Sequence, residues 1–173
     1  LYPKEQTTVS GRVTPKNGIS VSDPLYGDGW TVTAHPDGSI LDSKGKRHTY
    51  LFWESSNYTP PEITEGFVVP KNKIANFFRE KLRYLGLNKR EIEHFIDFWK
   101  PILNKKPYYL ISFYDQKTIE EMAPLSVSPK PDTIIRVFFD SRPLDEPIKI
   151  KEQQLVPAQR SGFSVIEWGG MKY

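Results

Sequence analysis

The stretch Asp132 to Asp140 reads Asp-Thr-Ile-Ile-Arg-Val-Phe-Phe-Asp. It is apolar on both faces apart from Arg136, and prolines precede and follow it, at Pro131 and Pro143. A strand with one wet face alternates apolar and polar residues, whereas a strand that is apolar throughout is covered on both sides. The stretch therefore predicts an interior strand of a covered sheet.

Two amphipathic helices are predicted upstream of this strand. Asn72 is expected to cap the first helix, and Gly86 suits the left-handed position that ends it. Asn88 is expected to cap the second, with Glu91 three residues later as in a capping box. Apolar stripes run along both: Ile74, Phe77, Phe78, Leu82 and Leu85 in the first, Ile92, Phe95, Ile96, Trp99 and Leu103 in the second. The short link predicts a hairpin of helices packed on one face of the sheet.

The first 54 residues predict short β-strands. Residues 7–13 alternate, and Asn17-Gly18 favours a tight hairpin turn into residues 19–21. Further turns divide residues 30–54 into a meander. We expect an α+β fold with an antiparallel or mixed sheet. Residues 1–28 are expected to form an N-terminal extension with a β-hairpin, which could serve as an adaptor to another part of the protein. Residues 29–173 are expected to form a single α+β domain.

Composition narrows the classes of function. The net charge is only +3, from 24 basic and 21 acidic residues that are interspersed, which argues against nucleic acid as a partner. There are no cysteines and the three histidines are scattered, so we expect no metal site and no cofactor. No apolar run approaches the roughly 20 residues that cross a bilayer. The start at Leu1 favours an exported protein or a fragment of a longer one. Residues 57–59 match an N-glycosylation triplet, although Pro60 disfavours its use.

Four carboxylates are candidates for acid–base chemistry because they lie in or at the ends of predicted strands: Glu54, Asp115, Asp140 and Glu167. Two of them facing each other across a cleft could hydrolyse a glycosidic bond. Acidic residues also occur at strand ends as solvated or turn-capping groups, and this structural interpretation is the favoured one. Glu167 and Arg136 each interrupt an apolar strand, so we expect them to form a structural ion pair.

Three tryptophans are candidates for a binding surface. Trp30, Trp53 and Trp168 fall on predicted strands or strand ends, where they could form a flat platform for sugar rings or a contact for a partner protein. Most aromatic residues in such strands fill the core instead, and this alternative stays open.

Three segments resemble a recurring domain of uncharacterised bacterial exported or surface proteins. They read YLFWE at residues 50–54, SPKPDTIIRVFFD at 128–140 and VIEWGG at 165–170. The resemblance runs from about Gly29 to Gly170. It implies an exported or envelope-associated protein, and it carries no activity and no catalytic residue.

The leading hypothesis is a non-enzymatic extracellular or cell-surface module for binding or assembly, in adhesion or as a structural component. Its partner would be a protein, including a second copy of the chain, or a glycan. The alternative is a carbohydrate-active hydrolase that uses a pair from Glu54, Asp115, Asp140 and Glu167.

Overall fold

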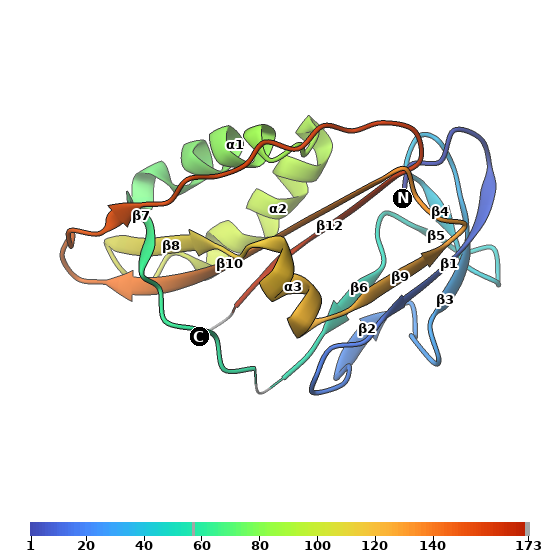
Figure 1. Cartoon of the computed structure of the whole chain (residues 1–173), viewed down its shortest axis with the longest axis horizontal. Coiled ribbons are helices and arrows are strands. Elements are labelled where there is room, and N and C mark those ends of the chain that lie inside the picture. Colours follow the sequence, from blue (N-terminus) through green and yellow to red (C-terminus); the bar gives the residue numbers. More distant parts are fainter. Residues whose placement is uncertain (57, 172–173) are drawn as a thin grey trace. The chain divides into compact units, whose positions relative to one another are not determined.

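The computed structural model describes residues 1–56 and 58–171, so Asn57 of the glycosylation triplet lies outside the described residues. Contacts group the chain into two compact units, each built from three segments (Figure 1). The first unit contains Leu1–Thr59, Asp115–Ile134 and Arg160–Ile166. The second contains Pro60–Tyr114, Ile135–Gln159 and Glu167–Tyr173.

The first unit is built on a five-stranded antiparallel sheet in the order β5-β4-β3-β1-β9. Its strands are β1 (Thr7–Val13), β3 (Trp30–Ala34), β4 (Ile40–Leu41), β5 (Arg47–His48) and β9 (Leu125–Ser128). One face carries the core, where Val9 lies opposite Val32. The short helix α3 (Gln116–Met122) precedes β9 in the chain. Residues 1–28 belong to this unit, since β1 pairs with both β3 and β9.

The strands on either side of Asn17-Gly18 do not pair with each other. The turn itself forms, with Gly18 at φ 71° and its N–H donating to the carbonyl of Pro15. However, β2 (Val21–Asp23) pairs with β6 (Phe52–Glu54) in a separate two-stranded sheet. The prediction that residues 7–13 and 19–21 pair as a hairpin is therefore wrong, because the chain leaves the sheet that contains β1 after this turn.

The second unit is built on a mixed sheet in the order β11-β7-β8-β10-β12. Its strands are β7 (Glu65–Pro70), β8 (Tyr108–Phe113), β10 (Thr133–Leu144), β11 (Lys151–Glu152) and β12 (Ser164–Gly170), although residues 133–134 of β10 and 164–166 of β12 belong to the first unit. The pairs β7–β8 and β8–β10 are antiparallel, and β11 runs parallel to β7. Every residue from Ile135 to Ser141 is buried, which confirms a strand without a wet face for most of the predicted stretch. Asp132 and Ile134, at the start of that stretch, are exposed.

The helical hairpin consists of α1 (Ile74–Tyr84) and α2 (Lys89–Ile102), with a 3-10 turn at η1 (Lys71–Lys73) before α1. The capping box of α2 is confirmed: Asn88 Oδ1 accepts from the Glu91 N–H at 3.0 Å, and Glu91 Oε2 accepts from the Asn88 N–H at 2.7 Å. Gly86 has the expected positive φ, 92°. The cap expected at Asn72 is wrong, because Asn72 lies inside η1 and no side chain caps the start of α1.

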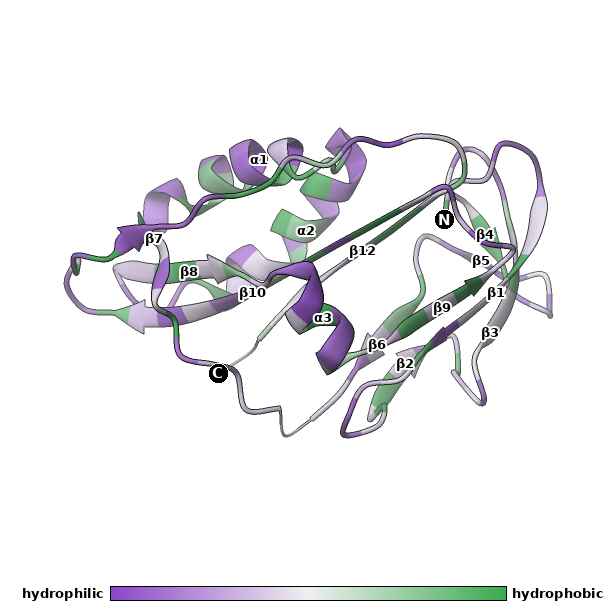
Figure 2. Cartoon of the chain, in the orientation of Figure 1, coloured by the Kyte–Doolittle hydropathy of each residue, from purple (hydrophilic) through white to green (hydrophobic). Residues whose placement is uncertain are grey.

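Aromatic packing holds this helical hairpin on one face of the sheet. The ring centroid of Phe139 on β10 lies 5.2 Å from that of Phe78 on α1, and 5.5 Å and 4.8 Å from those of Phe95 and Trp99 on α2. Figure 2 shows hydrophilic residues along both helices and a hydrophobic stretch along the middle of β10. The predicted α+β fold is confirmed. No helix within the described ranges is both long and apolar enough to cross a membrane.

Replacing Phe139 with alanine should lower the free energy of unfolding of the second unit by about 3–5 kcal/mol, because its ring is fully buried between both helices. Urea unfolding followed by circular dichroism measures the change. The control is Tyr84→Ala, since Tyr84 is 50% exposed on the same unit, and its effect should stay within about 0.5 kcal/mol. Equal effects of the two substitutions would contradict the central role of Phe139.

Candidate functional site

The four candidate carboxylates are divided between the two units. Glu54 and Asp115 belong to the first unit, and Asp140 and Glu167 to the second. Asp115 is the N-cap of α3, where its Oδ1 accepts from the Thr118 N–H at 2.7 Å. Hydrogen bonds from Thr118 hold the pKa of Asp115 below its ordinary value. A lowered pKa suits a structural cap and is the reverse of what a general acid needs.

The two carboxylates of the second unit are paired with arginines. Asp140 is fully buried, and its Oδ2 accepts from Arg142 Nη2 at 3.0 Å. Glu167 Oε2 accepts from Arg136 Nε at 2.5 Å. The ion pair expected from the two interruptions of apolar strands is therefore present, on β10 and β12. Both carboxylates have partners that balance their charge, which is the structural interpretation of these residues.

The three tryptophans do not gather on one surface of a single unit. Trp30 is buried in the core of the first unit, and its Nε1 donates to the carbonyl of Pro24 at 2.9 Å. Trp53, on β6, is half-buried and packs against the same core. Trp168 belongs to the second unit, where its ring lies 5.4 Å from that of Phe95. The contacts of Trp53 and Trp168 are those of side chains that fill a core. Trp30 packs into a core as well, and it also lines a groove on the first sheet.

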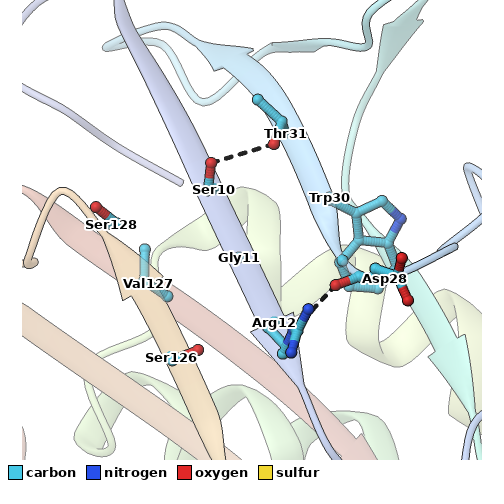
Figure 3. Close-up of a pocket in the computed structure, with 10 residues that line it drawn as sticks. Ser10, Gly11, Arg12, Asp28, Trp30, Thr31, Ser126, Val127 and Ser128 are labelled. Carbon is cyan, nitrogen blue, oxygen red and sulfur yellow. Dashed lines mark hydrogen bonds between the residues drawn. The ribbon is translucent and has the colours of Figure 1, made fainter.

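A groove of about 390 Å³ lies along the solvent face of the first sheet. It is lined by residues 10–12, 28–31 and 126–128, which belong to β1, β3, β9 and the turn before β3. The volume falls within the range of small-ligand sites. Figure 3 shows the lining residues projecting from three neighbouring strands.

Strand register brings the hydroxyl groups of the groove into rows. Ser10 lies opposite Thr31 on one side and Ser128 on the other, and the Ser10 and Thr31 hydroxyls are 3.1 Å apart (Figure 3). Ser126 lies opposite Arg12 in the next exposed row. Within residues 1–56 and 58–171, the Ser126 and Ser128 hydroxyls make no hydrogen bond. Each hydroxyl can donate one hydrogen bond and accept two, so the rows offer a dense set of sites to a polar ligand.

Arg12 supplies the positive charge of the groove. Its Nε donates to the carbonyl of Asp28 at 2.9 Å, which fixes the direction of the guanidinium group (Figure 3). The hydroxyl of Tyr26 holds the turn that carries Asp28 against β1, because it donates to the Val13 carbonyl at 2.6 Å and accepts from the Val13 N–H at 3.0 Å. The bond to Asp28 orients Arg12, and the Tyr26 hydroxyl holds the turn against the neighbouring residue, Val13.

Gly29 permits the close approach of this turn to β1. Its φ is 133°, which favours glycine, and a Cβ atom there would lie 3.0 Å from the carbonyl oxygen of Gly11. The approach of the turn to β1 therefore depends on glycine at position 29.

Trp30 lines the groove and was a candidate binding residue from the sequence, whereas the other residues of the lining were not expected. Residues 7–13 were predicted to alternate, but only their apolar side was assigned a role. The signal that could have found the site is the polar half of the same period, Thr8, Ser10 and Arg12, repeated as Thr31 and Thr33. The pairing of β1 with β9 could not be predicted locally. No group of histidine, aspartate or glutamate side chains within the described chain is placed to hold a metal ion.

Comparison with known proteins adds nothing to the geometry of the site. No family model matches the chain, and neither does any curated protein or solved structure. The resemblance to bacterial exported or surface proteins stays a prediction, and function has to be argued from the chemistry of the groove.

The Asp115 carboxyl should titrate below its ordinary value of 3.8. Because folding lowers this pKa, ionised Asp115 stabilises the fold above the unfolded value, and the contribution is lost as pH falls through the folded value. Carbon-13 NMR titration of the aspartate carboxyls measures the midpoint. Thr118→Ala should raise it in part, since the backbone N–H of residue 118 remains. A midpoint near neutral pH would contradict the structural role of Asp115 as a helix cap.

Replacing Glu167 with glutamine should lower the free energy of unfolding by about 3 kcal/mol, because the buried Arg136 guanidinium then loses the negative charge of Glu167. The double variant Arg136→Met/Glu167→Leu should recover most of that loss, as removing both charges avoids the uncompensated one. Urea unfolding compares the two. Glu121→Gln is the control, since its partner Lys117 is 84% exposed, and should cost less than about 1 kcal/mol. A double variant no more stable than the single would show that the pair is held by other contacts.

Proposed function

We propose that this chain is a non-enzymatic binding module of an extracellular or cell-surface protein, and that the groove on β1, β3 and β9 binds a glycan. The observation that carries the proposal is the set of exposed hydroxyls on three hydrogen-bonded strands, with a fixed arginine at one end. The localisation rests on the resemblance of the chain to bacterial exported proteins.

A polyhydroxylated ligand suits the groove better than a protein surface does. The cores of protein interfaces are depleted in serine and rich in aromatic residues, whereas the exposed lining here is mostly serine and threonine. Sugar hydroxyls and side-chain hydroxyls can each donate and accept, so rows at strand spacing can match successive hydroxyls of a sugar chain.

The hydrolase hypothesis receives no comparable support. Asp140 and Glu167 are paired with arginines, and Asp115 caps a helix with a lowered pKa. Glu54 lies on β6, outside the residues that line the groove. No specific observation favours catalysis, so binding alone is proposed.

Removing one cross-strand pair of hydroxyls should weaken glycan binding. The variant Ser10→Ala/Thr31→Ala removes two hydroxyls of the groove and should lower affinity roughly tenfold, at about 1 kcal/mol or less for each lost hydrogen bond. Affinity electrophoresis through gels that contain soluble polysaccharides, followed by calorimetry with oligosaccharides, measures the change.

The matched control is Thr8→Ala/Thr33→Ala. Thr8 and Thr33 are the next cross-strand partners on the same face of the same strands, and neither lines the groove. This control should bind as the unmodified protein does. Equal losses in both variants would place binding elsewhere, and retention of no polysaccharide by the unmodified protein would overturn the proposed function.

A further inference from the structure

We propose that the groove is selective for acidic polysaccharides, and that Arg12 binds a carboxylate of a uronate residue. This inference rests on the proposed function, because it takes the groove to be the glycan site. It adds the chemical class of the ligand and the residue that selects it.

The pairing of the arginines distinguishes Arg12 from others in the chain. Arg79, Arg136 and Arg142 each donate to a carboxylate, those of Glu93, Glu167 and Asp140 respectively. Arg12 donates only from Nε, and only to a backbone carbonyl, within residues 1–56 and 58–171. Its two Nη groups face no acidic partner in that part of the chain. An exposed arginine with this fixed direction retains the donors that a ligand carboxylate accepts.

The geometry of the guanidinium group suits a carboxylate. Its planar fork can form two parallel hydrogen bonds to the two oxygens of a carboxylate. The bond from Nε to Asp28 orients this fork before a ligand arrives, which reduces the entropy lost on binding. Figure 3 shows the Asp28 carboxylate directed away from Ser126 and Ser128, so it does not occupy the side of Arg12 that the serines border.

The rest of the lining favours a sugar acid over a phosphate chain. Arg12 and Asp28 are the two charged residues among those that line the groove, so the lining carries no excess of positive charge. A nucleic acid or polyphosphate would need several cations to replace its counterions. A uronate chain carries one carboxylate beside several hydroxyls in each sugar, and that combination matches one arginine beside Ser10, Ser126 and Ser128.

Calorimetry with two forms of one polymer tests the selectivity. The probes are oligogalacturonate of uniform length and its fully methyl-esterified form, which keeps the sugar backbone and lacks the charge. The unmodified protein should bind the acid form roughly ten- to a hundredfold more tightly, because a charge-assisted pair is lost in the ester. Arg12→Gln should remove that difference, and Arg12→Lys should restore only part of it, since lysine lacks the fork.

The control variant is Arg47→Gln. Arg47 is an exposed arginine on β5, at the opposite end of the same sheet, and it does not line the groove. It should leave the preference unchanged. Equal loss in both arginine variants would show a general charge effect and overturn the inference.

The remaining outcomes separate the two proposals. Equal binding of the acid and the ester, lost in Ser10→Ala/Thr31→Ala, would keep the glycan site and overturn the role of Arg12. Equally tight binding of a sulfated dextran would overturn carboxylate selectivity in favour of any anion. Failure of the unmodified protein to bind either form, or any other polysaccharide, would overturn both proposals.

Discussion

Burial of β10 on both faces is the constraint on which the second unit depends. A strand without a wet face must cover its apolar side chains and satisfy every polar one, because an unpaired charge away from water is costly. Phe139 meets the first requirement through its contacts with Phe78, Phe95 and Trp99. Arg136 meets the second through Glu167 on the neighbouring strand β12, and Asp140 meets it through Arg142, two residues later in β10. The seven buried residues Ile135 to Ser141 therefore need the helical hairpin to cover their apolar side chains and β12 to supply the partner of Arg136.

The strands of the first unit follow the opposite pattern, with one buried face and one exposed face. Its strands alternate, so Val9 and Val13 enter the core while Ser10 and Arg12 stay exposed. A sheet with one wet face leaves a polar surface whose spacing is set by hydrogen-bonded strands. The Asp140 and Glu167 carboxylates of the second unit are paired with arginines, whereas the Ser126 and Ser128 hydroxyls of the first unit make no hydrogen bond within the described part of the chain.

Local sequence patterns predicted the features that depend on neighbouring residues. The doubly covered strand, the capping box of Asn88 and Glu91, and the left-handed Gly86 all follow from rules that act over a few residues. The Arg136–Glu167 pair was also predictable, since each of these charged residues interrupts an apolar strand and therefore needs a partner of opposite charge. Pairing between distant strands was not. The partner of β2 is β6 rather than β1, and β9 joins β1 from far along the chain.

Apart from Trp30, the residues of the groove were not predicted, for the same physical reason. Its lining comes from three strands, and no one of them contains more than a short row of serine, threonine or arginine. The tryptophans were candidates for a binding surface because their side chains are large and aromatic. The same size gives them a large favourable free energy on burial, so they often fill the core instead. Arginine presents the reverse case. Its charge resists burial, so whether it meets a carboxylate within the fold separates an arginine that stabilises the chain, such as Arg136, from one whose donors face outward, such as Arg12.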